Sequence, residues 1–313
     1  MSDSQEVDTI EFELPPAGAP LEPPPFSSSS VHVEVGARSH AGLVRPNNED
    51  SFFVARLGRW LETLQTNLPG TALPPRFEEV GYLLLVADGI GGAAAGEVAS
   101  RMAIAASVNH ILRKTRWLQR VEPAEVRPIL DRMLDDIRRV DSTLKEQAQA
   151  DAALAGMGST LTIAYSVGAH LFLAHVGDSR AYLFRGGTLL QLTRDHTLAR
   201  SMAEAGLIPP DEVATHRLRH VLTHALGGAE SQVEADVQHV PLADGDCLLL
   251  CSDGLTDMVG DARIAAALGG AASPAEACDA LVGLALAAGG RDNVTAVVAR
   301  YIIPEGVAAP PPA

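Results

Sequence analysis

Carboxylates stand beside four predicted strands of this 313-residue chain. Asp88 and Asp253 each follow an apolar run and precede a glycine, while Glu49–Asp50 and Asp292–Asn293 each come just before a strand-like stretch. A carboxylate at the end of a buried strand is poorly solvated, so it requires a proton, a cation or several hydrogen bonds.

Two interpretations of these acids remain open from the residues alone. Asp-Gly and Asn-Asp sequences mark turns, and for any one site taken by itself a turn is the commoner explanation. If the four sites converge, their oxygen atoms without a His or Cys pattern suit Mg²⁺ or Mn²⁺ rather than Zn²⁺. Spacing alone does not decide whether they converge.

The glycine-rich stretch Gly91–Gly96 does not match a nucleotide-binding motif. It has the spacing with which a P-loop begins, but Glu97–Val98 stands where that motif requires Lys and then Ser or Thr. A dinucleotide-binding fingerprint also fails, because no acid lies between Glu97 and Glu122 to bind a ribose. The chain has no G-x-S-x-G sequence, which argues against a serine hydrolase of that class.

The composition indicates a soluble, cytoplasmic protein. The net charge is −15, and seven acids lie within positions 1–37, which carry no Lys or Arg. Without a basic stripe, nucleic acid and anionic membranes are unfavourable partners. The apolar run 280–290 is too short to span a bilayer, and the acidic N-terminus lacks the apolar core of a secretory signal. Because no CxxC pair occurs, Cys247, Cys251 and Cys278 are expected to be small core residues in a reducing compartment.

Hydrophobic patterning predicts a folded part over residues 31–303, between Pro-rich tails at 1–30 and 304–313 whose composition favours disorder. Residues 58–78, which contain Pro69, Gly70, Pro74 and Pro75, are expected to form a surface insertion. Strands are predicted at 31–35, 51–55, 82–87, 160–167, 170–177, 180–185, 189–193, 248–251 and 294–303, and helices at 97–112, 123–150, 198–205, 261–268 and 274–288. Because most strands are neighbours in sequence, the pattern favours an α+β fold with antiparallel sheets and helices outside.

Seven short motifs follow one another along the chain, and their order is more specific than any one of them. They are Gly42–Asp50, Val86–Gly92, Gly156–Thr160, His175–Ala181, Leu192–His196, Cys251–Leu255 and Gly290–Val294. Together they resemble the metal-dependent Ser/Thr protein phosphatases of the protein phosphatase 2C type, in their bacterial form. The resemblance extends from about residue 33 to about residue 301.

The resemblance implies a four-layer α-β-β-α sandwich, in which two antiparallel sheets are flanked by helix pairs and a metal cleft lies at one end. It implies two Mn²⁺ or Mg²⁺ ions, with Asp88 bridging both and the Gly89 carbonyl ligating the first. The remaining metal residues that it implies are Glu49, Asp253 and Asp292 at the second ion and Asp50, which would hold metal-bound waters.

The resemblance also assigns roles outside the ligand set. Arg45 would clamp the substrate phosphate, a task that its planar donor fork suits, and Asn293 would support the site from behind the ligands. Arg45, Asp88 and Asp253 are thus the expected catalytic residues. Two metals can acidify a bridging water that attacks phosphorus directly, so no cysteine nucleophile is needed.

Two departures from the family pattern concern the leaving group and a third ion. Vertebrate members carry a His after the Asp-Gly, where this chain has Ile90, an apolar residue as in most bacterial members. A metal-bound water is the hypothetical substitute as proton donor, and His40 and His196 are expected to be structural. Many members bind a third, weaker ion through an Asp four residues before the Ser/Thr of the Gly-Ser/Thr motif, where Ala155 stands. A third metal site is therefore expected to be weak or absent.

The expected function is metal-dependent hydrolysis of phosphoserine and phosphothreonine in proteins, opposing a bacterial Ser/Thr kinase in signalling. The partners would be phosphorylated proteins, including that kinase and its targets, and the chain would be a monomer. Residues 197–228 resemble the family's flap, and the basic stretch 215–220 within it either meets substrates or is a solvated loop. Two alternatives stay open: a non-catalytic, phosphatase-like regulatory module, and a phosphatase of another phosphomonoester.

Overall fold

The computed structural model describes residues 30–68, 76–91, 95–113, 121, 125–228 and 233–305. Its fold is α+β, with two β-sheets and two groups of helices. The predicted tails lie outside the described residues, apart from Ser30 and residues 304–305. No helix in the described ranges combines the length and the hydropathy that a membrane span requires.

Sheet I has five strands in the order β1-β11-β10-β7-β8. Their bounds are β1 His32–His40, β7 Arg180–Arg185, β8 Thr188–Gln191, β10 Cys247–Cys251 and β11 Val294–Ile302. All neighbouring pairs are antiparallel. The register of β1 on β11 pairs His40 with Val294, so the chain segments that carry the first and last acidic motifs emerge at the same edge.

Sheet II follows the order β2-β3-β5-β6-β9, and the short β4 pairs with the end of β3. Its strands are β2 Asp50–Glu62, β3 Arg76–Ile90, β4 Gly158–Ser159, β5 Leu161–Val167, β6 His170–Val176 and β9 Asp236–Pro241. The pairs from β3 through β5 and β6 to β9 are antiparallel. The distal parts of β2 and β3, within Trp60–Phe77, belong to a unit separate from the rest of the described chain.

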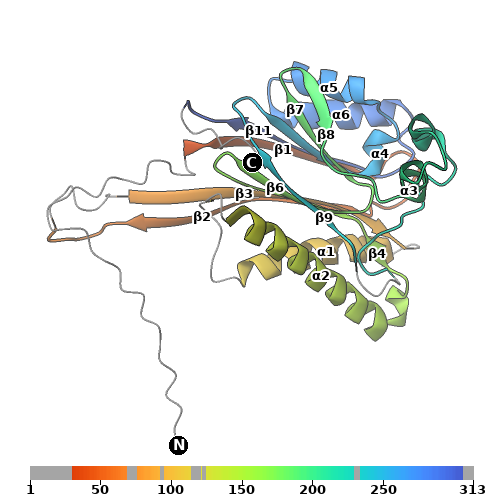
Figure 1. Cartoon of the computed structure of the whole chain (residues 1–313), viewed down its shortest axis with the longest axis horizontal. Coiled ribbons are helices and arrows are strands. Elements are labelled where there is room, and N and C mark those ends of the chain that lie inside the picture. Colours follow the sequence, from red (N-terminus) through yellow and green to blue (C-terminus); the bar gives the residue numbers. More distant parts are fainter. Residues whose placement is uncertain are drawn as a thin grey trace, which may run out of the picture. The chain divides into compact units, whose positions relative to one another are not determined.

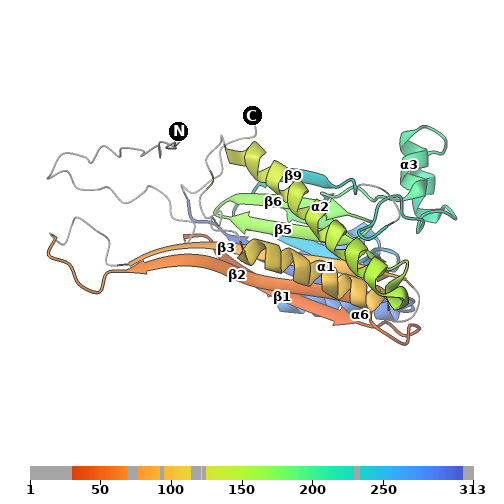
Figure 2. The same ribbon diagram turned by 90° about the horizontal axis from the view of Figure 1, so that it is seen from below.

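Helices cover the outer face of each sheet in the main unit (Figures 1 and 2). The long helices α1 (Ala95–Leu112) and α2 (Val126–Ala150) lie across sheet II, and α5 (Asp261–Gly270) and α6 (Pro274–Ala287) lie on sheet I. The remaining helical segments are short: η3 Ala152–Leu154, α3 Leu198–Glu204, η4 Pro210–Thr215 and α4 Asp253–Thr256. The predicted α-β-β-α layering is confirmed.

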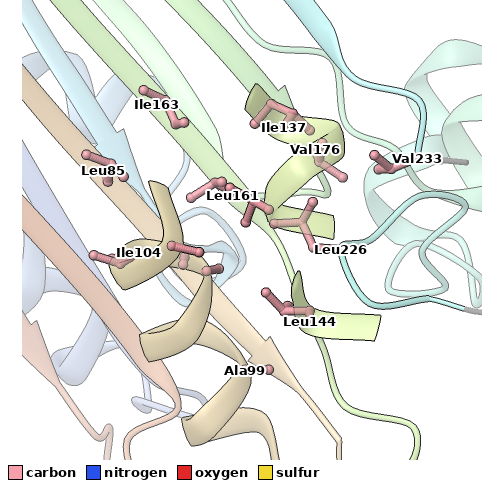
Figure 3. Packing of buried hydrophobic residues seen from close by; sticks show 14 of the residues in the cluster. Leu85, Ala99, Ile104, Ile137, Leu144, Leu161, Ile163, Val176, Leu226 and Val233 are labelled. Atoms are coloured by element: carbon pink, nitrogen blue, oxygen red, sulfur yellow. The ribbon is translucent and has the colours of Figure 1, made fainter. Parts of the chain in front are cut away.

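The strand patterns follow from this layering, because both faces of the central strands are buried. Leu84 and Val86 face the core between the sheets, whereas Leu83 and Leu85 face α1 and α2. Figure 3 shows Ile137 of α2 and Leu226 of the later loop region meeting this second core. Because the residues on both faces of the strand are apolar, the sequence shows a continuous apolar run here.

Most predicted elements are present. The short segments β4, η3, η4 and α4 were not predicted, and three longer elements also differ from expectation. β3 does not end at Asp88–Gly89 but runs to Ile90, because β4 pairs with Gly89 and Ile90. The expected insertion at 58–78 is partly strand, since β2 extends to Glu62 and β3 begins at Arg76. β9 was not predicted. The three cysteines are buried, as predicted.

Candidate active site

One asparagine fastens the loop before β2 to the loop before β11. The Nδ2 amide of Asn293 donates to the carbonyls of Ala41 at 2.9 Å and Asn47 at 2.8 Å. Its Oδ1 accepts from the Glu49 backbone N–H at 2.8 Å. A side-chain amide is suited to this position because it donates and accepts at once. These bonds place Glu49 and Asp292 in one neighbourhood although 242 residues of chain separate them.

Arg45 is exposed at the edge of the same loop. Its Nη2 donates to Asp292 Oδ2 at 2.6 Å. This bond raises the pKa of Arg45, and the charges of Asp292, Glu49 and Asp253 act in the same direction. Arg45 therefore stands as the fixed positive charge over a group of carboxylates, with part of its guanidinium facing solvent.

Asp50 is the most deeply placed of the predicted acids, with 7% of its surface exposed. Ser252 Oγ donates to its Oδ2 at 2.7 Å, and the Thr295 backbone N–H in turn donates to Ser252 Oγ at 3.0 Å. Its other oxygen, Oδ1, is buried without a hydrogen-bond partner in the described part of the chain. An orphaned buried carboxylate oxygen is costly unless a proton or a cation satisfies it.

The backbone around Asp88 is held by the segment that contains β4, which pairs with the end of β3. The Asp88 N–H donates to Thr160 Oγ1 at 2.9 Å, and its carbonyl accepts from the Thr160 N–H at 2.9 Å. The Gly89 N–H donates to the Glu49 carbonyl at 3.2 Å, which joins β3 to the Glu49 loop. A Cβ on Gly89 would lie 2.0 Å from the Gly96 carbonyl oxygen, so only glycine fits there.

Asp253 begins α4 directly after β10. The next residue, Gly254, packs so closely on the Asn293 carbonyl that a Cβ would lie 1.9 Å from its oxygen. This contact sets Asp253 beside the Asp292–Asn293 turn. The two Asp-Gly sequences thus allow close backbone packing against Gly96 and Asn293, which is more than a local turn.

The predicted acids lie near enough for their charges to act on one another, but no three of them in the described part of the chain have ligand atoms within 4.8 Å of each other. Burial raises the pKa of Asp50 to about 7, and the charges of Asp253 and Asp292 contribute. Burial also raises the pKa of Asp88 well above its usual value, together with the charges of Asp50, Asp253, Asp178 and Asp292. The pKa of Glu49 is raised by burial and by Asp292, and lowered in part by Arg45.

The donor set fits divalent cations of the Mg²⁺ or Mn²⁺ type. Glu49, Asp50, Asp88, Asp253 and Asp292 supply carboxylate oxygens, and Gly89 supplies a carbonyl. Hard oxygen donors without thiolates are the environment that these ions prefer. The orphaned Asp50 oxygen and the raised carboxyl pKa values both indicate a site that lacks positive charge by itself.

Three further polar residues beside these acids were not predicted as metal-site residues. Asp178 follows β6, and burial and the charge of Asp253 raise its pKa well above the usual value. Asp257 lies one turn after Asp253, and His220 lies 3.3 Å from it between Nε2 and Oδ2. Asp178 stood inside one of the recognised motifs and could have been found there. His220 ends the basic stretch 215–220, which the sequence singled out as a substrate-facing or solvated segment and not as a neighbour of these acids.

The other residues singled out by the sequence lie as follows. His40 Nδ1 accepts from the Gly42 N–H at 2.9 Å within its own turn. His196 is buried, and its Nδ1 accepts from the Gly177 N–H at 3.2 Å. Ile90 is 37% exposed, and Ala155 follows η3 without a polar side-chain atom. Burial raises the pKa of Cys251 to about 12, as it does that of Cys278, so neither thiol is a ready nucleophile.

Comparisons with known proteins agree with this fold. The family model for protein phosphatase 2C matches residues 76–283. The serine/threonine protein phosphatase PstP of Mycobacterium tuberculosis is 39% identical over 270 residues, which is 86% of this chain and 45% of PstP. The serine/threonine phosphatase stp of Listeria welshimeri is 36% identical over 225 residues, 72% of this chain and 86% of stp.

A solved structure of the PstP catalytic domain in complex with two manganese ions is also similar. Its TM-score is 0.67 at 36% identity, and the match covers 87% of this chain and 99% of that domain. The chain belongs to the protein phosphatase 2C family, whose bacterial members include named Ser/Thr protein phosphatases. It spans about half the length of the first curated relatives that it matches, namely 45%.

Proposed function

We propose that this protein hydrolyses phosphoserine and phosphothreonine in phosphorylated proteins, in a reaction that depends on divalent cations. The observation that carries the proposal is that Asp50, Asp88, Asp253 and Asp292 lie in one neighbourhood, where burial and the charges of the neighbouring acids raise the carboxyl pKa values of Asp50 and Asp88. The names of the PstP and stp relatives supply the substrate class.

Two Mn²⁺ or Mg²⁺ ions are the proposed cofactors. Asp88 and the Gly89 carbonyl would hold the first ion, and Glu49, Asp88, Asp253 and Asp292 would hold the second. Asp50 would anchor water beside them. When bound, such a pair supplies an acidified water for in-line attack on phosphorus and neutralises the charge that develops there. The PstP domain with two manganese ions supports a pair of ions in this family.

The chain's own residues would bind and orient the phosphate. Arg45 has guanidinium atoms free to face solvent while Asp292 holds one of them, so it can clamp phosphate oxygens without losing its position. Asn293 would keep Glu49 and Asp292 in register through its three hydrogen bonds. Ile90 cannot protonate the leaving alkoxide, so water remains the proposed proton donor.

A third ion that depends on position 155 is proposed to be weak or absent, because the methyl group of Ala155 offers no ligand atom. The variant Ala155→Asp should bind one more Mg²⁺ than the wild type and turn over faster. Isothermal titration and initial rates would measure both effects. Unchanged ion number and unchanged rate would refute this part of the proposal.

The physiological context is proposed by extension from the family. Phosphorylated proteins would be the substrates, among them a Ser/Thr kinase and its targets, and the protein would act as a cytoplasmic monomer. Arg217 and Arg219 of the stretch 215–220 carry the positive charge with which the flap, residues 197–228, would meet phosphorylated segments.

The first test is phosphate release from a phosphothreonine peptide with Mn²⁺, with Mg²⁺ and with a chelator. Release should require metal, and Asp253→Asn should lose it. A matched control is Asp279→Asn, since Asp279 is an exposed acid on α6 whose partner is Arg38. No release at any metal concentration from well-folded protein would favour the non-catalytic module, and equal rates on small phosphomonoesters but none on peptides would favour another substrate.

A further inference from the structure

The far end of β2 presents apolar side chains to solvent. Trp60 is 68% exposed, and Leu64, just beyond the strand, is 83% exposed. Leu61 between them is also exposed. Single exposed apolar residues are ordinary on a protein surface, whereas a group of them indicates a contact site.

The backbone of β2 is exposed along one side as well. The strand stands first in the order β2-β3-β5-β6-β9, and no strand pairs with its outer side in the described ranges. Its 13 residues make it longer than most strands. A long edge of this kind offers a row of backbone N–H and C=O groups to another strand. The edge and the exposed side chains together indicate that the missing partner is an extended segment.

The N-terminal segment, which lies outside the described residues, contains one stretch with the pattern of a strand. Residues 9–14 read Thr-Ile-Glu-Phe-Glu-Leu, so that Ile10, Phe12 and Leu14 alternate with polar residues. Strict alternation of this kind is typical of a strand with one apolar face. Pro15 and Pro16 follow directly, and prolines limit how far such a strand can continue.

Opposite charges favour contact between this segment and β2. Residues 1–30 contain six acids and no Lys or Arg. The exposed half of β2 carries Arg56 and Arg59, and Arg59 is 65% exposed although it pairs with Glu79. A second copy of β2 would bring arginines where the N-terminal segment brings carboxylates. The segment is therefore the better-matched occupant.

The alternation of side chains lets apolar and charged contacts form together. Arg59 and Trp60 are successive residues of β2, so they point to opposite faces of the sheet. When Phe12 lies on the face of Trp60, Glu11 and Glu13 fall on the face of Arg59. Aromatic pairs and opposite-charge pairs between neighbouring strands both stabilise a sheet.

The connecting chain is long enough for this contact. Residues 15–30 join Leu14 to Val31, and Val31 belongs to the core cluster against which Val54 of β2 packs. A Pro-rich linker of this length can span about 50 Å, whereas the stretch of β2 from Val54 to Glu62 covers about 26 Å. Tethering also keeps the segment at an effective concentration on the order of millimolar.

We propose that residues 9–14 add to the outer edge of β2 as a further strand and cover Trp60. The N-terminal segment then closes the free edge of sheet II within one chain. This inference goes beyond the proposed function, because neither residues 9–14 nor Trp60 belong to the proposed metal site.

Hydrogen exchange of the full chain tests the inference from the side of the N-terminal segment. About half of the amides of residues 9–14 should be protected, because alternate residues of an added strand donate to its neighbour. Phe12→Asp should abolish this protection. Phe26→Asp, at an apolar position outside the alternating stretch, is the matched control and should keep it. Protection of β5 and β10 in the same experiment verifies that each variant is folded.

The same experiment tests the inference from the side of β2. Trp60→Asp should also remove the protection of residues 9–14. Its matched control is Leu190→Asp, since Leu190 is 57% exposed on β8, the edge strand of sheet I. Exchange of the protected amides should be at least about tenfold slower in the wild type than in Phe12→Asp or Trp60→Asp.

Residues 9–14 that exchange as an unstructured peptide in the wild type would overturn the inference. Protection that persists in both Phe12→Asp and Trp60→Asp would overturn it as well. Protection that rises with protein concentration, together with a dimer in sedimentation, would show that the occupant comes from a second copy and not from the same chain. None of these results depends on phosphate release, so the proposed function is judged separately.

Discussion

At the scale of single residues, Asn293 explains how distant motifs form one site. Its amide makes three hydrogen bonds to the loop before β2, and the Asp292 carboxylate beside it pairs with Arg45. The residue itself need not touch a metal ion or the substrate. Its contribution is to remove freedom from Glu49 and Asp292, and partners of this kind typically change metal affinity by about 10–100-fold.

Asn293→Ala should therefore weaken Mn²⁺ binding by about 10–100-fold and lower the free energy of unfolding by about 1–3 kcal/mol, because buried polar groups lose their partner. Isothermal titration and urea unfolding measure the two effects. Asn109→Ala, at an exposed position near the end of α1, is the matched control. Unaltered Mn²⁺ affinity in Asn293→Ala would show that the loop keeps its position without the amide.

The sequence singled out Glu49, Asp50, Asp88, Asp253 and Asp292 because each one borders a predicted strand. Asp88 and Asp253 stand where a buried strand should continue, and that conflict is visible without a structure. Asp178 and Asp257 follow turn and helix patterns without such a conflict. His220 could not be predicted, because its proximity to Asp257 depends on how the flap folds back through Val221 and Leu198.

At the scale of elements, the site depends on the two helices that cover sheet II. Ile137 of α2 is fully buried against strands β5 and β6, together with Leu161 and Val176 (Figure 3). The flap returns to this layer, since Leu226 packs in the same core and the Gly227 N–H donates to Asp141 of α2 at 2.9 Å. Packing of α2 thus stabilises the base of the flap.

Ile137→Ala should lower the free energy of unfolding by about 2–5 kcal/mol, because it removes buried methylenes and leaves a cavity. Urea unfolding measures the change. Glu146→Ala, at an exposed position of the same helix, should stay within about 0.5 kcal/mol. A loss below 1 kcal/mol in Ile137→Ala would mean that α2 contributes little to the core.

Element prediction succeeded for the strands with apolar patterns and failed for the edge strand β9. The buried strands β5, β6 and β10 show as apolar runs. β9 is an edge strand with polar residues such as Asp236, Gln238 and His239, and its pairing with β6 makes it a strand. A tertiary contact of this kind overrides local pattern.

At the scale of the whole molecule, the fold concentrates negative charge that it does not neutralise. The net charge is −15, and the carboxyl groups of the cleft carry raised pKa values in the metal-free protein. Folding without metal must then either protonate these groups or accept their repulsion. Metal binding removes the conflict, so stability, pH and metal concentration are linked.

The pKa of Asp50 determines whether stability rises or falls as pH rises. Its pKa is about 7 in the folded chain and about 3.9 in an unfolded one, so between these values the folded state binds more protons. The contribution of Asp50 to stability is therefore present at low pH and is lost as pH rises through 7. Burial lowers the pKa of His170 and of His175 to about 4, which gives the opposite slope below pH 6.5. The contribution of Asp50 must therefore be measured between two proteins in which these histidines contribute equally.

The difference in free energy of unfolding between the wild type and Asp50→Asn removes the histidine contribution, because both proteins keep every histidine. In chelator, the free energy of unfolding of the wild type relative to the variant should fall by about 2 kcal/mol from pH 5.5 to pH 8. Saturating Mn²⁺ should remove this fall in the wild type, since the ion needs the ionised carboxylate. Asp279→Asn, at an exposed position of α6, should show no pH-dependent difference from the wild type. If the wild type instead gains stability relative to Asp50→Asn as pH rises, Asp50 is ionised in the folded protein without metal, and another group must supply the positive charge.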